Sequence, residues 1–447
     1  MHPFRILITL SCFLTGSFIS AAQNTFTVQQ AVEYAIKNEA NVKNAFIDRD
    51  IAQKKVNELI GIGLPQINME ADATRFLKIP TTFVPAEFFN GESGTFAPVQ
   101  FGQNYTASAG ITATQLLFDG SYLVGVQASK TYAELSKKTY EQIKIETAEK
   151  VMKAYYSVLV NEERFASLNA NVQRLKKLRD DTKALYENGF VEKMDLDRTE
   201  VAYNNLLSTR DQTEKLLALT KGFLKFQMGM DPKADIVLTD NLQSITFESS
   251  PADGSMPDFK NRIEYSILET TQKLQQLDLK KNRFQYLPSL VAYGSFSYNA
   301  SRNNFDLFDT DKKWYPTSLI GAKISLPVFD GLQKRARIQQ SKLNLEKIKN
   351  GFTSLEYGLT LESMKAQTDM TNSISALEAQ RKNRELANDV VRTARIKYEQ
   401  GVGSNLEIIS AETDLRDAET NYYAALYQAL VAQTDLQKAK GTLLKNY

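Results

Sequence analysis

The chain has 447 residues, 43% of them hydrophobic, and its 54 basic residues nearly balance its 52 acidic residues. Because this balance gives neither a basic footprint nor a polyacidic tail, we predict that nucleic acid is not a partner. The one histidine, His2, and the one cysteine, Cys12, both lie near the start of the chain.

Residues 1–22 have the pattern of a secretory signal peptide. Arg5 precedes an apolar run from Ile6 to Ile19, and small residues follow, so cleavage is expected after Ala22. The run holds about fourteen residues, too few for a stable membrane-spanning helix. Lipidation at Cys12 is an alternative, although the residues before it match a lipoprotein signal poorly.

Cleavage after Ala22 would leave a chain with neither histidine nor cysteine. Nucleophile arrangements that need either residue, and zinc sites built on them, are then excluded. Carboxylate-only catalysis stays open on composition, but no pattern supports it. We therefore predict a protein that is not an enzyme, with no catalytic residues, no metal site and no cofactor. No later apolar stretch reaches about eighteen residues, so a membrane location would require β-strands.

The rest of the chain repeats one plan. Asn38 and Leu64-Pro65 recur 223 residues later, and Phe118-Asp119-Gly120 recurs 211 residues later as Phe329-Asp330-Gly331. Tyr186-Glu187-Asn188-Gly189 recurs 212 residues later as Tyr398-Glu399-Gln400-Gly401. These markers predict a first repeat over 23–229, a proline-containing linker over 230–257 and a second repeat over 258–447.

In the first repeat we expect a helix over about 38–63 and a β-hairpin over about 64–118. Tyr105 to Thr114 alternates apolar or small residues with polar ones, as a strand with two different faces does. The intervening loop holds four phenylalanines, at 83, 88, 89 and 96, which suggest an interfacial aromatic girdle or ordinary loop packing. Residues 99–231 lack proline, which predicts a long helix over about 121–187, a turn near 188–190 and a returning helix to about 229.

The second repeat has the same order: a helix over about 261–286, a β-hairpin over about 287–329, and a long helix from Leu332 to about Gln400. Five apolar or small residues recur every seven residues in this long helix and predict a coiled-coil stripe: Ile338, Leu345, Phe352, Leu359 and Ala366. Glycines at the turn near 400–404 suit a helix C-terminus, and Ser404 is a candidate N-cap for the returning helix, which runs to about 441.

Four strands cannot close a membrane barrel, because the smallest such barrels have about eight. Unpaired strand edges are not tolerated in hydrocarbon, so several chains must share one barrel. We predict a mainly α fold with a membrane β-barrel: a 12-stranded barrel shared by three chains, four strands per protomer, joined to a long α-helical coiled-coil barrel.

This order of elements resembles the TolC family of outer-membrane efflux proteins over essentially the whole chain after the signal. The resemblance is carried by LPQI and LPSL, by LLFDG and LPVFDG, and by YEQGVGSNLEIISAETDL. It implies a homotrimeric, porin-like passive channel in outer-membrane lipid of a Gram-negative bacterium, with a large periplasmic portion and with 230–257 at its equator. It also implies a periplasmic adaptor and an inner-membrane transporter, in tripartite efflux or type I secretion. The alternative is a secreted coiled-coil structural or adhesive protein without a pore.

The resemblance also implies a constriction near the turns. Asp195 matches the acidic position after the first turn and Glu407 the one after the second, and both could instead only complement helix N-termini. Ser410 stands where some relatives have a second acid, and Asn405 where an arginine clasp is sought, so the sequence departs from the family pattern there. Tyr398 could join a gating contact or only pack. The turn residues are the expected adaptor-contact tips, besides making the turns: Gly189, Phe190, Val191, Gly401, Val402 and Gly403.

Overall fold

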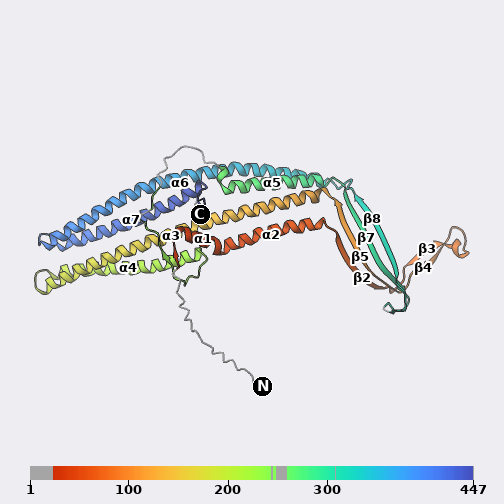
Figure 1. The fold of residues 1–447 in the computed structure, drawn as a ribbon, viewed down its shortest axis with the longest axis horizontal. Helices are drawn as coiled ribbons and strands as arrows, with labels where there is room; N and C mark the ends of the chain where they lie inside the picture. The colour runs from red at the N-terminus through yellow and green to blue at the C-terminus, as the bar shows by residue number, and fades with distance from the viewer. Residues whose placement is uncertain (1–23, 243–244, 248–258, 308, 446–447) are drawn as a thin grey trace, which may run out of the picture.

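The computed structural model describes residues 24–242, 245–247, 259–307 and 309–445. Figure 1 shows an elongated molecule with paired helices along most of its length and a small sheet at one end. The expected signal peptide, with His2 and Cys12, lies outside the described residues, as does part of the 230–257 linker. Among the described helices, none is long and apolar enough to span a membrane.

The two longest helices of the described chain, against which the shorter ones pack, are α3 (Gly120–Glu187) and α6 (Gln333–Glu399). The shorter helices α2 (Ala40–Ile62) and α5 (Ile263–Phe284) pack beside them near the sheet. Farther away, α4 (Lys193–Gln227) returns along α3, and α7 (Asn405–Ala439) returns along α6. The lateral order is α2-α3-α5-α6 near the sheet and α4-α3-α7-α6 in the far half.

The predicted helices form where the sequence places them, and none of them contains proline. In α6 the residues of the predicted seven-residue pattern all lie on its packed side, with Leu359 and Ala366 fully buried. The start of α3 is fixed by Asp119, whose carboxylate accepts a hydrogen bond of 2.9 Å from the Tyr122 amide.

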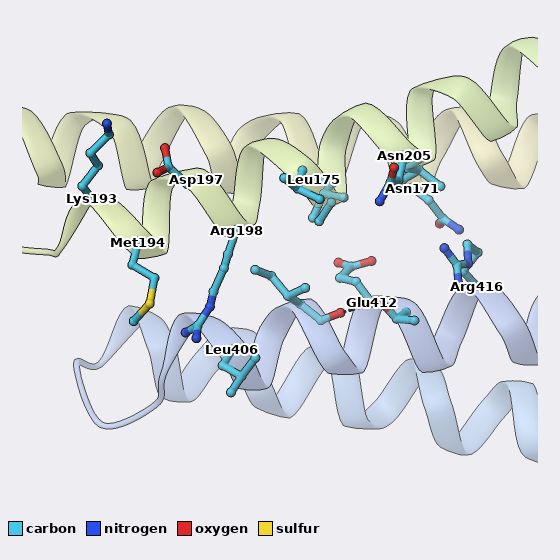
Figure 2. A pocket seen from close by; sticks show the side chains of 15 residues that line it. Asn171, Leu175, Lys193, Met194, Asp197, Arg198, Asn205, Leu406, Glu412 and Arg416 are labelled. Atoms are coloured by element: carbon cyan, nitrogen blue, oxygen red, sulfur yellow. Dashed lines mark hydrogen bonds between the residues drawn. The ribbon is translucent and has the colours of Figure 1, made fainter.

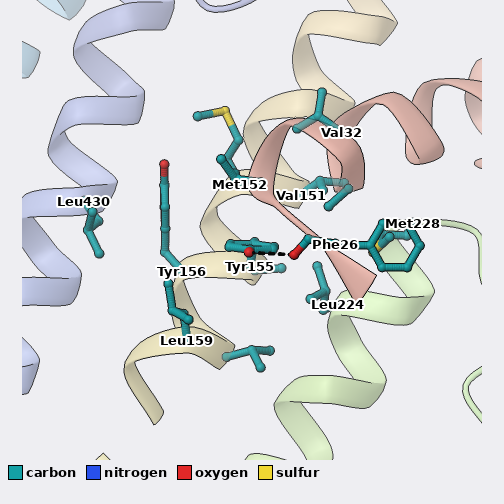
Figure 3. Close-up of a cluster of buried hydrophobic side chains, with 14 of the residues drawn as sticks. Phe26, Val32, Val151, Met152, Tyr155, Tyr156, Leu159, Leu224, Met228 and Leu430 are labelled. Carbon is teal, nitrogen blue, oxygen red and sulfur yellow. Dashed lines mark hydrogen bonds between the residues drawn. The ribbon is translucent and has the colours of Figure 1, made fainter. Parts of the chain in front are cut away.

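One helix was not anticipated. The chain forms α1 (Val28–Asn38) before α2, and Thr27 and Gln30 make a reciprocal capping box at its start. Just ahead of it, the two-residue strand β1 (Thr25–Phe26) pairs in parallel with β6 (Val237–Leu238) of the linker. These elements pack beside α3. Tyr155 of α3 is fully buried there, and its hydroxyl donates a hydrogen bond of 2.9 Å to the Phe26 carbonyl (Figure 3).

Each repeat also makes the same close internal contact at an equivalent glycine. Gly229 follows α4 with φ +68°, and Gly441 follows α7 with φ +67°. A Cβ atom added at Gly229 would lie 2.7 Å from the Asn38 carbonyl oxygen, and one added at Gly441 would lie 2.7 Å from that of Asn261. Asn38 and Asn261 are repeat markers, so each repeat uses glycine for both the left-handed turn and the close approach.

The sheet contains four antiparallel strands in the order β2 (Gln66–Arg75), β5 (Tyr105–Phe118), β7 (Ser289–Arg302) and β8 (Tyr315–Ser325). The register gives it two different faces. One is mostly apolar and includes Ile67, Met69, Ile111, Phe296, Tyr298 and Ile320. The other is mostly polar and includes Asn68, Glu70, Asp72, Ser108, Thr112, Ser297, Thr317 and Lys323.

The loop between β2 and β5 is more ordered than the sequence suggests. It forms a second hairpin of β3 (Thr81–Pro85) and β4 (Phe96–Gln100), with a 3-10 helix, η1 (Ala86–Phe89), between them. The four phenylalanines for which the sequence leaves a girdle or ordinary loop packing open lie on this hairpin, beyond the end of the sheet. A further 3-10 turn, η3 (Phe259–Asn261), precedes α5.

Candidate functional site

The two helical hairpins end at neighbouring turns, at the end of the molecule farthest from the sheet (Figure 1). Gly189 has φ +76° and Gly401 has φ +74°, and neither would bring a Cβ atom within 4 Å of another residue. Glycine is therefore needed at both turns for its backbone conformation. Phe190 and Val402 follow these glycines and are strongly exposed. Each turn thus exposes one large apolar side chain.

Ser404 caps the returning helix α7, as the sequence predicts. Its hydroxyl accepts a hydrogen bond of 3.2 Å from the Glu407 amide. The Glu407 side chain is exposed in the first turn, and Ser410 and Asp414 lie on the same exposed face of α7. Asp414 was not singled out from the sequence, although it stands one turn beyond Ser410.

Asp195 is placed differently from its counterpart Glu407. It lies in the first turn of α4 and is half-buried, because it faces the junction of the two hairpins. There, Asn405 of α7 is 5% exposed, and its amide nitrogen donates to the Asp195 carbonyl at 2.9 Å and to the Thr199 hydroxyl at 2.8 Å. Asn405 thus links the two hairpins, while its buried Oδ1 has no hydrogen-bond partner in the described part of the chain.

Tyr398 lies at the end of α6 and packs against the apolar cluster that holds the far halves of the hairpins together. That cluster includes Leu178 of α3 and Ile408 of α7. The Tyr398 hydroxyl is buried and, within the residues that the structure describes, has no hydrogen-bond partner. This placement fits the packing interpretation.

An arginine–carboxylate cluster that is not among the predictions from the sequence joins the hairpins about two helical turns from the tips. The Glu412 side chain of α7 is only 7% exposed. Arg174 of α3 approaches it at 3.4 Å, and Arg395 of α6 at 3.1 Å. Asn171 contacts Arg174 and donates to Glu419 at 2.7 Å. We call Arg174, Arg395 and Glu412 the clasp, because these three residues connect three helices.

The sequence did contain one signal for the clasp. Ile408 and Leu415 lie on the packed face of α7, and Glu412 falls between them on that same face. A carboxylate at such a position needs a charged or hydrogen-bonding partner. Its arginine partners lie 238 and 17 residues away in the chain, so they become evident only once the helices are packed.

A groove of about 760 Å³ runs between α4 and α7 beside the clasp. Its exposed apolar lining includes Met194, Val201 and Leu406. Figure 2 shows Met194 and Arg198 of α4 directed toward α7 beside Leu406. Among the described residues, no three His, Cys, Asp or Glu side chains gather as they would around a metal ion. The tip region therefore offers apolar grooves and charged clusters.

Comparisons with known proteins agree on one family. The model of the family described as outer membrane efflux protein matches residues 31–219 and 269–442. The outer membrane protein TolC of Salmonella enteritidis is 22% identical over 99% of this chain and 86% of its own length. The proteases secretion protein PrtF of Dickeya chrysanthemi is 20% identical, over 99% of this chain and 93% of its own length.

Solved structures share the fold. The Campylobacter jejuni CmeC outer membrane channel superimposes with a TM-score of 0.73 at 16% identity, covering 93% of this chain and 86% of that one. The open state of the Neisseria gonorrhoeae MtrE outer membrane channel gives a TM-score of 0.72 at 18% identity, over 93% and 89% of the two chains.

Proposed function

The chain belongs to the outer membrane efflux protein family, and on that basis we propose that three copies close into one passive exit duct. The protein is an outer-membrane channel of tripartite efflux or type I secretion, with a large helical portion in the periplasm. In this proposal each copy supplies four strands to a 12-stranded barrel and two helical hairpins to the tunnel below it.

The observation that carries the proposal is that the protomer is open at both sides. In the described part of the chain, β2 has no strand partner on its outer edge, and neither has β8. On the same two sides, α4 exposes Leu219 and Phe226, and α6 exposes Tyr357 and Leu361. One open side of a copy can pair with the other side of the next copy, and such head-to-tail contacts form a ring when the rotation closes.

The two faces of the sheet support the same arrangement. A barrel made from this sheet would direct its mostly apolar face to lipid and its hydroxyl-, amide- and carboxylate-bearing face to the lumen. A polar lumen provides a path for solutes, which the alternative of a coiled-coil protein without a pore does not need.

At the other end, we propose that the tips form the controllable opening. Glu407, on the exposed face of α7, would line the constriction, while the clasp and Asn405 hold the two hairpins of each copy together. Opening then requires the hairpins to separate or tilt, which strains these contacts. The exposed turn residues around Phe190 and Val402 would contact a periplasmic adaptor, which would connect the duct to an inner-membrane transporter.

Two measurements test the proposal. The purified protein should have the mass of a trimer in detergent and should conduct ions in planar bilayers. Affinity purification from crosslinked envelopes should recover an adaptor and a transporter with it. Protein that sized as a monomer and still formed pores would contradict the shared barrel, and a trimer that never conducted would favour the poreless alternative.

A further inference from the structure

The hairpin of β3 and β4, residues 81–100, leaves the sheet as a separate arm. Figure 1 shows it projecting from the end of the sheet that lies farthest from the helices. Its strands pair with each other, and in the described part of the chain their other extensive contact is with η1 inside the arm. A two-stranded hairpin alone is at best marginally stable in water. The arm therefore needs a surface outside its own chain to hold it in one place.

One face of the arm is apolar beyond the Thr81–Gln100 pair at its base. Phe83 lies opposite Pro98, and Pro85 lies opposite Phe96, so these four side chains share a face. Phe88 and Phe89 continue the apolar surface at the tip, and the four phenylalanines are 57% to 80% exposed. Phenylalanine lacks the polar handle with which tyrosine and tryptophan meet water at a membrane surface. The arm thus fits a dry contact.

Charge favours a protein surface over a lipid surface. Between Ile79 and Asn104 the chain carries two acids, Glu87 and Glu92, and no lysine or arginine. Anionic lipid headgroups attract basic segments and repel acidic ones. Glu87 is also used inside the arm, where it accepts hydrogen bonds from the Ser93 hydroxyl at 2.5 Å and the Gly94 amide at 3.1 Å. The acidic tip is therefore poorly suited to an anionic lipid surface.

The arm starts at the proposed seam between copies. Arg75, the last residue of β2, pairs with Tyr105, which pairs with Arg302 at the end of β7, so these strand ends share one rim of the sheet. If the open edge of β2 pairs with β8 of the next copy, the β7–β8 turn of that copy comes to lie beside the arm.

The β7–β8 turn, residues 303–307 and 309–314, offers a firm surface. Leu307 is buried against Ala107 and Ala300, and Lys312 pairs with Asp306. The Phe305 ring lies tilted against that of Tyr105, with 5.5 Å between ring centroids, and remains 67% exposed. A fixed, exposed aromatic ring on one copy would thus lie near the unpartnered phenylalanine face of another.

We propose that the arm of each copy packs on the β7–β8 turn of the next copy and latches the seam at the outer rim of the barrel. The inference rests on the proposed trimer. It adds an interface that lies outside the strand pairing itself, made by phenylalanines of the arm and by Phe305 of the neighbouring copy.

Disulfide crosslinking tests this contact. In a Cys12→Ser background the chain has no other cysteine, so Phe88→Cys and Phe305→Cys can be introduced together. Oxidation of the double variant should then give disulfide-linked dimers and trimers. Neither single variant should give a crosslink between the arm and the neighbouring copy. A control that combines Phe88→Cys with Phe226→Cys on α4 should not give one either. A trimer of normal size in detergent that never crosslinks through the Phe88 and Phe305 pair would overturn the latch. A monomer would instead contradict the trimer.

Two further measurements separate the remaining occupants. A fluorophore on Phe88→Cys should be shielded from spin-labelled lipid, and strong quenching would assign the arm to the bilayer and overturn the proposal. Replacing residues 81–100 with a short Gly-Ser linker should lower the dissociation temperature of the detergent-solubilised trimer by several degrees while leaving single-channel conductance close to wild type. An unchanged dissociation temperature would also count against the latch.

Discussion

At the scale of single residues, two glycines with the same backbone conformation have different surroundings. Gly441 and Gly401 both have positive φ, but only Gly441 has a neighbour, the Asn261 carbonyl, within 2.7 Å of an added Cβ atom. Gly401→Ala should cost about 1–2 kcal/mol, the strain of a left-handed alanine. Gly441→Ala should cost more, because the carbonyl must also move. Thermal unfolding followed by circular dichroism measures the loss of stability in each variant. Equal losses would mean that the close approach of Gly441 to the Asn261 carbonyl adds nothing to the cost of the substitution.

The clasp gives a second prediction at this scale. Glu412→Gln keeps the size of the side chain but removes the charge that Arg174 and Arg395 share. Hydrogen bonds to a charged group contribute about 1.5–3 kcal/mol, so we expect a loss of that order per protomer. The melting temperature should fall, and spontaneous openings in bilayers should become more frequent. Asp417→Asn, which affects an exposed pair with Arg416 on the same helix, is the matched control and should change neither.

Residues fixed by local geometry could be predicted, and residues fixed by packing between hairpins could not. Ser404 follows a glycine turn and precedes a helix, so its role as N-cap follows from the sequence and is confirmed. The role of Asn405 depends on Thr199, which reaches it only because α4 and α7 converge. The same holds for the clasp, whose members come from three helices.

At the scale of elements, the continuity of the long helices matters most. Leu359 is buried in α6 and is the fourth of the five residues in its seven-residue pattern. Leu359→Pro would remove a helical hydrogen bond and clash with the preceding turn, which costs about 3 kcal/mol. Outer-membrane accumulation and export should both fail. Leu359→Ala, which loses packing but keeps the helix, should accumulate at a reduced level, and normal accumulation of the proline variant would contradict a continuous helix.

A charged network joins α3 to α7 near the equator. Glu149 pairs with Lys153 at 2.7 Å and with Lys438 at 2.8 Å, and Lys153 also reaches Asp435 at 2.5 Å. Burial alone would raise the pKa of Glu149, but the hydrogen bonds from the two lysines outweigh it and hold the pKa below its ordinary value of 4.5. The ionised carboxylate therefore binds α3 to α7.

The sign of the pH dependence follows from this lowered pKa. The ionised Glu149 carboxylate makes its full contribution to stability above its ordinary pKa of 4.5. That contribution is lost as the pH falls through the lower pKa that Glu149 has in the folded protein. The wild-type melting temperature should therefore drop on acidification below about pH 5, and that of Glu149→Gln should drop less. Glu141→Gln, which affects a pair with Lys144 inside α3, serves as the control. Parallel pH profiles for wild type and Glu149→Gln would contradict the assignment.

Elements with a long periodic pattern could be predicted, and short ones could not. The lengths of α3 and α6 follow from the turn markers within the proline-free stretches 99–231 and 328–447, which leave room for a pattern that repeats many times. By contrast, α1 has eleven residues, and its one local signal is the capping box of Thr27 and Gln30. The arm was expected to be a loop, because five-residue strands rich in proline and phenylalanine give too short an alternation to recognise.

At the scale of the whole molecule, the order of elements is the same at both ends. The sequence β2-β5-β7-β8 across the sheet and the sequence α4-α3-α7-α6 across the tips both run from the first repeat to the second. A copy added at one side therefore continues sheet and helices together. Four strands and two hairpins per chain therefore form a closed barrel and tunnel only when several copies assemble in a ring. The same arrangement explains why large apolar side chains such as Phe226 and Tyr357 are exposed in a single copy.

A ring also brings the three copies of Glu407 together, and this gives the last prediction. If their carboxylates face the constriction, multivalent cations should block current from the periplasmic side. Glu407→Gln should weaken the block by about tenfold or more, since each charge contributes about 1 kcal/mol at close range even in water. The Ser404 cap uses the Glu407 backbone, so α7 should lose only about 0.3–1 kcal/mol from the missing helix-terminus charge.

Asp195→Asn provides the contrast. Asp195 is half-buried beside Asn405, whereas Glu407 is exposed, so this variant should change the block much less than Glu407→Gln. An equal effect of the two variants would show that both carboxylates line the constriction, as the repeat spacing of 212 residues between them suggests. An unchanged block in Glu407→Gln, with the trimer intact by size, would show that Glu407 serves only to complement the start of α7 and that the cation-binding face must be sought elsewhere on the hairpins.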